Sequence, residues 1–215
     1  MNIRTMTRTA MLGGLIASSS AFANLITVNP GFETPAVTGV SGFNYRNTGD
    51  AGWGWTTGAT DSRSRGAVQF NATYAPGNLQ PVGAGSQSVQ LEYAGDYIEQ
   101  TIALTVGQTY SLSFLLASYQ PPATSSLKVS VGGVGNSFFT GGASWVAQAF
   151  TFTAALASTS IRFTNNNTSA GFTYPHLDNI SLDLASVPAP ATLALVGAGL
   201  LALGLSRRRR SVAPA

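Results

Sequence analysis

Apolar and polar residues alternate in short runs through the middle of the chain. In the segment TYSLSFLLASY, every second residue from Tyr110 to Leu116 is apolar, and serines stand between the first of them. The same period of two recurs in the segments QSVQLEYAG, DYIEQTIALT, SSLKVSVGG, FTFTA, SIRFTNN and NISLDLA. Successive side chains of a strand point to opposite faces, so this pattern predicts strands that bury one face.

Glycine and asparagine clusters separate these runs and indicate tight turns, as in Gly132-Gly133 and Asn165-Asn166-Asn167. No part of the middle shows a sustained helical period. About eight antiparallel strands at this spacing predict an all-β fold, a single jelly-roll β-sandwich over residues 24–186. The glycine-punctuated segment 34–58 has little strand pattern and is expected to form a long surface loop.

The first 23 residues have the three-part order of a secretory signal peptide. Arg4 and Arg8 form a positive start, an apolar stretch follows, and Ala21-Phe22-Ala23 makes a small-x-small cleavage site. The alternative, a buried amphipathic first helix, lacks an N-cap and a helical period. We therefore expect export, with a mature chain that begins near Asn24.

An uncharged run of residues, 187–206, precedes four adjacent arginines at the other end of the chain. As a helix, this run would span about 30 Å, which is enough to cross the hydrocarbon core of a bilayer. Arg207, Arg208, Arg209 and Arg210 would then stay on the cytoplasmic side. The pattern predicts a C-terminal transmembrane helix that anchors the protein in a membrane, followed by a short tail, 211–215.

Charge is sparse between these two ends. Charged residues make up 9% of the chain, against about 25% in ordinary soluble domains. Residues 24–186 hold five basic and eight acidic side chains, which leaves a formal charge of −3. The absence of a basic stripe argues against a nucleic-acid partner, and a chain without cysteine has neither disulfides nor thiolate metal sites.

The C-terminal pattern resembles the PEP-CTERM sorting signal. The matching parts are Val187-Pro188-Ala189-Pro190, the small-residue apolar run and the arginine cluster Arg207–Arg210. The resemblance implies a Gram-negative-type bacterium, processing by an exosortase, and release into the envelope or an extracellular matrix. Ala189 stands where this family has its name-giving glutamate, which bears on the processing step and not on insertion.

Residues 25–185 resemble galactose-binding-domain-like jelly rolls, among them many carbohydrate-binding modules. The resemblance rests on LITVNPGFETP, GWGWTTG, GDYIEQTIALTVGQTYSLSF and HLDNISLDL, in this order. Related modules carry a structural calcium ion, which would lie near Glu33 and Asp178 here. Calcium takes about six to eight oxygen ligands, so two carboxylates would supply only part of them. The alternative is that Glu33 is a solvated turn residue and that Asp178 stabilises a turn.

Aromatic side chains are the candidate ligand contacts, because flat apolar faces stack on sugar rings while a few polar groups bind the hydroxyls. Trp53 and Trp55 share one parity and have glycine neighbours that would leave their rings accessible. A place in the core is the equal alternative for both. Tyr119, next to a turn with two prolines, and Trp145 complete the set of predicted ligand-binding residues.

Catalytic signatures are missing from the sequence. The one histidine, His176, has no nucleophile motif to serve, and strand alternation would place Asp96 and Glu99 on opposite faces. We therefore expect a non-catalytic protein of the envelope or matrix that binds polysaccharide. The alternatives are a structural or adhesion protein without specific glycan binding, and a glycan-active hydrolase that uses Glu92 or Glu99.

Overall fold

The computed structural model describes residues 24–38, 42–58, 66–71, 85–119, 124–168, 173–185 and Leu200. The predicted signal peptide, the tail and all of the predicted anchor except Leu200 lie outside the described residues. Within the described residues, no helix combines the length and the apolar composition needed to cross a membrane.

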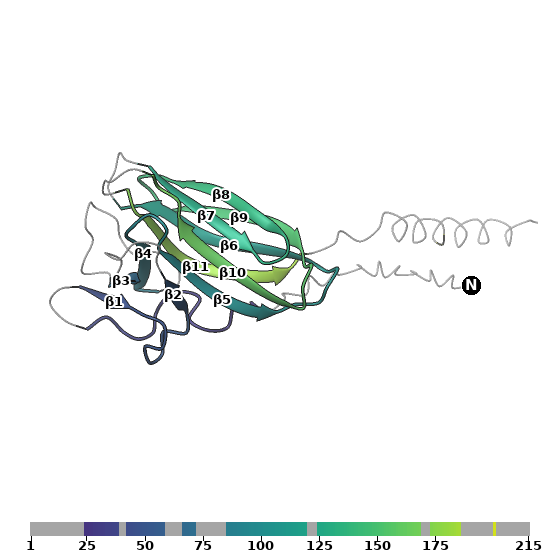
Figure 1. The fold of residues 1–215 in the computed structure, drawn as a ribbon, viewed down its shortest axis with the longest axis horizontal. Coiled ribbons are helices and arrows are strands. Elements are labelled where there is room, and N and C mark those ends of the chain that lie inside the picture. Colours follow the sequence, from purple (N-terminus) through teal and green to yellow (C-terminus); the bar gives the residue numbers. More distant parts are fainter. Residues whose placement is uncertain are drawn as a thin grey trace, which may run out of the picture.

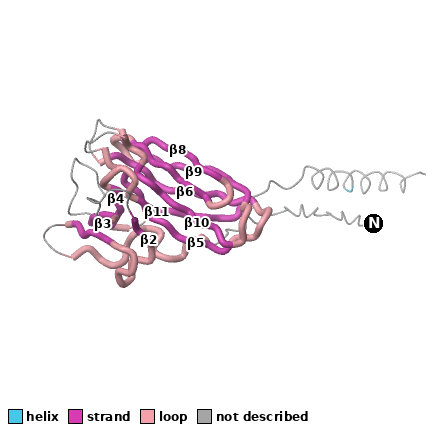
Figure 2. The backbone as a smooth tube through the Cα atoms, viewed as in Figure 1, coloured by secondary structure: helices cyan, strands magenta, loops and turns pink. Residues whose placement is uncertain are grey.

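The described chain forms two antiparallel sheets that face each other (Figure 1). Six strands form one sheet, in the order β1 (Phe43–Arg46), β3 (Ala67–Asn71), β4 (Gln87–Leu91), β11 (Pro175–Leu184), β6 (Thr109–Ser118) and β9 (Val146–Thr153). Five form the other, in the order β2 (Thr56–Gly58), β5 (Tyr97–Ala103), β10 (Ser158–Asn165), β7 (Ser125–Val131) and β8 (Gly135–Gly141). Figure 2 shows strands joined by loops throughout this unit, so the predicted all-β sandwich is confirmed.

The chain passes back and forth between the sheets from β4 onward. Strands β4, β6, β9 and β11 belong to the six-stranded sheet, and β5, β7, β8 and β10 belong to the five-stranded sheet. Most neighbouring strands in each sheet are therefore not consecutive in the chain, and the pairs β3–β4 and β7–β8 are the exceptions.

The alternating segments form the core as predicted. Along β6, Tyr110, Leu112 and Phe114 are buried. The facing sheet contributes Leu127 and Val129 from β7, which is buried at every second residue. Each alternating strand thus places its apolar face in the space between the sheets, where burial removes it from water.

The expected long loop of residues 34–58 contains two strands. Residues Phe43–Arg46 pair with β3, and residues Thr56–Gly58 pair with β5, each at the edge of its sheet. The two strands have four and three residues, which is too short for a period of two to be recognised in the sequence. Their hydrogen bonds to distant strands, and not their own pattern, define them.

Candidate functional site

Trp53 and Trp55 lie in the hydrophobic core. Their side chains are 0% and 2% exposed, and the ring of Phe32 lies 5.9 Å from Trp53 and 5.6 Å from Trp55. The indole Nε1 of Trp55 donates to the carbonyl of Asn29 at 3.1 Å. The second of the two sequence alternatives therefore applies, and neither ring offers a face to a ligand in this structure.

Gly54, between the two tryptophans, is required for a close backbone contact and does not serve to expose the rings. It has a φ of +74°, and a Cβ at this position would collide with the side chain of Val28. Glycine therefore lets the N-terminal segment approach the backbone here, where a larger residue would prevent contact.

Tyr119 and Trp145 come together around His176. The ring of His176 lies 5.9 Å from that of Tyr119 and 6.1 Å from that of Trp145, and Phe70 lies 5.3 Å away. The histidine is 3% exposed, and burial lowers its pKa to about 3. A neutral imidazole thus lies at the centre of an aromatic cluster.

His176 also positions an amide. Its Nε2 lies 2.8 Å from Oε1 of Gln90 on the neighbouring strand β4. An amide oxygen only accepts hydrogen bonds, so Nε2 donates and the ring is the Nε2-protonated tautomer. The NH2 group of Gln90 is then left to act as a donor.

These residues lie on the face of the six-stranded sheet that points away from the core. The strand registers place Tyr45, Val68, Gln90, His176 and Ala117 in one row across five strands. A cavity of about 110 Å³ opens beside this row, and we call it the aromatic cleft. Its lining residues are Phe43, Tyr45, Val68, Phe70, Gln90, Glu92, Tyr119 and Tyr174.

The aromatic cleft combines apolar walls with a few polar groups. Tyr119 and Tyr174 are neighbours, with ring centroids 5.4 Å apart, and burial raises the pKa of the Tyr174 phenol, with a further contribution from Glu92. Of the predicted ligand residues, Tyr119 lines the cleft and Trp145 contacts the buried histidine behind it. The contributions of β1, β3 and β4 had no local signal in the sequence, because only sheet register brings them to one place.

The acidic residues considered for hydrolysis are separated. Glu92 lines the aromatic cleft, while buried Asp96 accepts a hydrogen bond from the backbone N–H of Tyr93 at 2.9 Å. Glu99 lies on the other sheet, where its Oε2 is 2.8 Å from Nε of Arg162. These three carboxylates therefore do not form a pair around one ligand.

Glu33 and Asp178 do lie close together. Gly31 lies between them, since a Cβ at this glycine would be 3.8 Å from Oδ1 of Asp178 and 4.0 Å from Cγ of Glu33. A cavity of about 390 Å³ is lined by Asn29, Pro30, Gly31, Glu33, Thr34, Gly85, Asp178 and Asn179. The N-terminal segment reaches this site because the carbonyl of Pro30 accepts from Ile180 N at 2.9 Å.

The two carboxylates differ in how they are satisfied. Glu33 Oε1 accepts from the backbone N–H groups of Ser86 and Gln87 at 2.8 and 3.1 Å. Asp178 is 2% exposed, its Oδ1 accepts from Asn179 N at 2.6 Å, and its Oδ2 bonds to no described residue. Burial, with the nearby Glu33, raises the pKa of Asp178 to about 8.

A cation fits the donor chemistry of this site in part. A buried carboxylate oxygen without a partner is a polar group that a hard cation would satisfy. Among the described residues, however, no group of three or more histidine, cysteine, aspartate or glutamate side chains surrounds a common point. Backbone carbonyls would have to supply most of the remaining ligands, which is a common arrangement for calcium.

Comparison with solved structures shows a fold shared with distant proteins. A cyclase from Fischerella sp. TAU has a TM-score of 0.56 at 15% identity, and the match covers 79% of this chain and all of the cyclase. A Stig cyclase from Fischerella sp. TAU, in complex with (3Z)-3-(1-methyl-2-pyrrolidinylidene)-3H-indole, has a TM-score of 0.55 at 16% identity, over 78% of this chain and all of the other. TmCBM61, solved with beta-1,4-galactotriose, has a TM-score of 0.45 at 14% identity, over 76% and 99% of the two chains.

Two family models account for nearly all of the chain from residue 26 onward. No curated protein matches significantly. Residues 186–210 match the PEP-CTERM protein-sorting motif, which confirms the resemblance of the C-terminal segment and implies export. Residues 26–183, well over half of the chain, match the model described as "Protein of unknown function (DUF642)", and the protein therefore belongs to this family.

Proposed function

We propose that the protein is an exported, non-catalytic module that binds polysaccharide in the cell envelope or an extracellular matrix. The aromatic cleft is the observation that carries this proposal. It gathers phenol and phenyl rings with one amide and one carboxylate at a single hollow. Aromatic walls with a few oriented polar groups are the usual composition of a small-ligand site, and they suit a sugar ring with its hydroxyl groups.

The polar groups of the cleft are preorganised for such a ligand. Because His176 donates to Oε1 of Gln90, the amide is held with its NH2 group available to donate a hydrogen bond to a hydroxyl oxygen of the ligand. Glu92 offers acceptors in the same cleft. Fixed polar groups lose less conformational entropy on binding than mobile ones, which favours affinity.

A structural calcium ion at Glu33 and Asp178 belongs to the same proposal. When bound there, the ion would neutralise the Asp178 carboxylate, whose raised pKa reflects the cost of burying its charge. It would also fasten the N-terminal segment to β11, where Leu25 N already donates to the carbonyl of Leu182 at 2.8 Å. The back-and-forth strand order from β4 to β11 supports a jelly roll of the galactose-binding type around this site.

Sorting of the protein by an exosortase is also part of the proposed function. The segment Val187-Pro188-Ala189-Pro190 would be the processing region, the apolar run a transient inner-membrane anchor, and Arg207–Arg210 its cytoplasmic stop. Removal of the four arginines should then reduce retention in the membrane fraction of cells. Unchanged fractionation would argue against the anchor.

Glycan-array binding followed by titration with the best neutral polysaccharide tests the function. We expect saturable binding that Tyr119→Ala and Trp145→Ala both weaken. The matched control is Phe138→Ala, because Phe138 is an aromatic residue with 63% exposure on β8 of the other sheet. If no glycan binds while thermal unfolding is normal, a structural matrix role replaces the binding role; if a glycan is cleaved, the protein is a hydrolase.

A further inference from the structure

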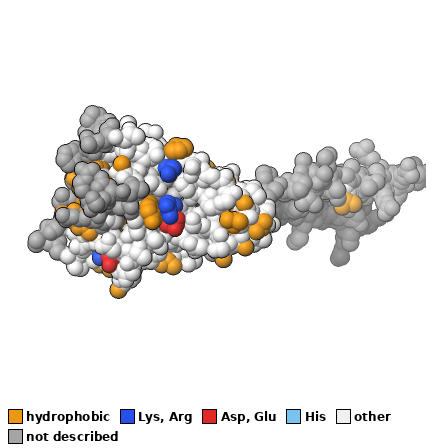
Figure 3. All heavy atoms as spheres, viewed as in Figure 1, with side chains coloured by type: hydrophobic (Ala, Val, Ile, Leu, Met, Phe, Trp, Pro, Cys, Tyr) orange, Lys and Arg blue, Asp and Glu red, His pale blue; other side chains and the backbone are white. Residues whose placement is uncertain are grey.

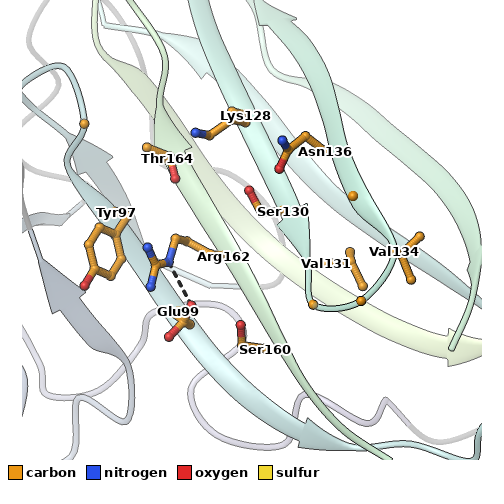
Figure 4. Close-up of a pocket in the computed structure, with 14 residues that line it drawn as sticks. Tyr97, Glu99, Lys128, Ser130, Val131, Val134, Asn136, Ser160, Arg162 and Thr164 are labelled. Atoms are coloured by element: carbon orange, nitrogen blue, oxygen red, sulfur yellow. Dashed lines mark hydrogen bonds and ion pairs between the residues drawn. The ribbon is translucent and has the colours of Figure 1, made fainter. Parts of the chain in front are cut away.

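The outward face of the five-stranded sheet carries a second, larger hollow. This open groove of about 640 Å³ crosses β5, β10 and β7 and reaches the start of β8. We call it the cationic groove and define it by Tyr97, Glu99, Lys128, Asn136, Arg162 and Thr164 (Figure 4). It lies on the opposite side of the sandwich from the aromatic cleft, because the two line the outward faces of different sheets.

Arg162 is fixed in a defined orientation within the cationic groove. Its Nε donates to Oε2 of Glu99 at 2.8 Å, and its guanidinium carbon lies 3.9 Å from the centroid of the Tyr97 ring. The side chain is 40% exposed, and its two Nη groups donate to no described residue. Stacking and one hydrogen bond thus hold the guanidinium in place and leave the N–H donors of both Nη groups at the surface.

A second cation lies diagonally across from Arg162. On β7, Ser130 is opposite Arg162, and Lys128, two residues earlier, is opposite Thr164. Diagonal neighbours of this kind have Cα atoms about 7–8 Å apart, so both long side chains can reach one ligand group. Lys128 forms no ion pair within the described part of the chain.

Thr164 provides an independent sign that the groove is a site. It lines the cationic groove directly opposite Lys128, and Figure 4 shows it on the strand that carries Arg162. Its side chain is 8% exposed, and its hydroxyl has no hydrogen-bond partner among the described residues. A buried hydroxyl without a partner is uncommon in proteins, and a ligand that it could contact would satisfy it.

The groove also concentrates positive charge in a domain with a formal charge of −3. Charged side chains are sparse on the face in Figure 3, where they interrupt a mainly uncharged polar surface. Three basic side chains lie in the described ranges, and Lys128 and Arg162 are two of them. The third, Arg46, is already bound to Oε1 of Gln69 and to the carbonyl of Pro35.

We propose that the cationic groove is a second glycan site and binds the carboxylate of an acidic polysaccharide, such as a hexuronate polymer. The planar fork of Arg162 matches a planar carboxylate, and Lys128 adds a point charge. Glu99, Ser130 and Asn136 line the same groove and match the hydroxyl groups of a sugar. The Glu99 carboxylate would repel the dense charge of a polyphosphate. This inference does not depend on the aromatic cleft.

Titration of the full chain with polygalacturonate, and with its methyl-esterified form, tests this proposal. The ester keeps the sugar backbone and removes the charge. We expect saturable binding of the acid, which weakens as salt rises, and at least about tenfold weaker binding of the ester. Arg162→Gln and Lys128→Gln should each weaken acid binding by about fivefold or more.

Two variants separate ligand binding from folding. Lys128→Gln removes a charge without a described ion-pair partner, so its thermal unfolding should match the wild type. Arg162→Lys keeps the charge but loses the fork, and we expect it to bind the acid more weakly than wild type. Tyr119→Ala should leave acid binding unchanged. Equal binding of acid and ester, acid binding lost in Tyr119→Ala but kept in the two groove variants, or equal binding of polyphosphate would each overturn the proposal.

Discussion

The outward faces of the two sheets differ although both sheets have the same alternating core. Strand β7 is buried at every second residue and presents polar side chains to the cationic groove. Strand β4 is buried along its whole length, and its outward residues, Ser88 and Gln90, are also covered. The same alternation of apolar and polar residues thus forms the core side of both sheets. The two outward faces differ because other side chains cover β4 and leave the polar residues of β7 open to the groove.

The comparison extends to how polar groups are held. In the aromatic cleft, a neutral buried His176 orients Gln90. In the cationic groove, Glu99 and Tyr97 orient a half-exposed guanidinium. The first arrangement favours uncharged ligands that stack on rings, and the second favours ligands that bring a negative charge.

Trp55→Ala should lower the free energy of unfolding of the whole sandwich, and with it the stability of both outward faces. The side chain is buried between the sheets and lies 6.3 Å from Phe163, and loss of a buried tryptophan costs about 3–5 kcal/mol. Urea unfolding should show a decrease of this size in the free energy of unfolding. The control Phe138→Ala, at an exposed position, should change it by less than about 0.5 kcal/mol; equal effects would refute the core placement.

Calcium should stabilise the end of the sandwich where the N-terminal segment joins β11. Calcium at about 100 times its Kd would add about 2.7 kcal/mol to the free energy of unfolding, and a chelator should lower Tm accordingly. Asp178→Asn should abolish the difference because it removes the buried charge. Asp183→Asn, further along β11, should preserve the difference. An identical Tm with and without chelator would reject this ion.

Tyr119→Ala should weaken binding of a neutral glycan without a comparable effect on folding. Loss of one stacking ring at a binding hot spot costs about 1–2 kcal/mol, which corresponds to about a tenfold increase in Kd. Calorimetric titration measures this change. Phe138→Ala should bind like the wild type, and a Kd that Tyr119→Ala leaves unchanged would remove this residue from the site.

His176 should give the free energy of unfolding a pH dependence that disappears when this residue is replaced. Its folded pKa of about 3 lies below the ordinary value near 6.5. As pH falls below 6.5, the unfolded chain takes up this proton first, so the contribution of His176 to the free energy of unfolding falls by up to about 1.4 kcal/mol per pH unit until folded-state protonation begins. Asp178, with its raised pKa of about 8, contributes the opposite slope, which cancels when wild type and His176→Gln are compared. The stability advantage of the wild type over His176→Gln should therefore shrink as pH falls. A constant advantage from about pH 7 to pH 5 would contradict the buried neutral ring.

Lys128→Gln is the control for this pH series. Because the lysine lies outside the aromatic cluster, this variant should follow the wild-type stability profile between about pH 7 and pH 5. A profile that departs from that of the wild type would mean that Lys128 also contributes to the pH dependence.

Several parts of the molecule were predictable from local pattern. The alternation around Tyr110–Leu116 predicted which residues face the core, and the sorting motif was recognised from residues near the C-terminus. The proximity of Glu33 and Asp178 was also expected, from a resemblance to jelly rolls, and the structure places both beside Gly31. Trp53 and Trp55 remained ambiguous because a glycine neighbour is compatible with either an open ring or a close backbone contact.

By itself, the sequence determined strands, turns, sparse charge and a sorted C-terminus, because each of these depends on residues that are neighbours in the chain. Only the tertiary structure decided that Gln90 meets His176, that Tyr119 joins Phe43 in one cleft, and that Lys128 lies diagonal to Arg162. The physical reason is strand register. A shift of one residue would turn every side chain of a strand to the other face, and register is set by contacts between segments that are far apart in the sequence.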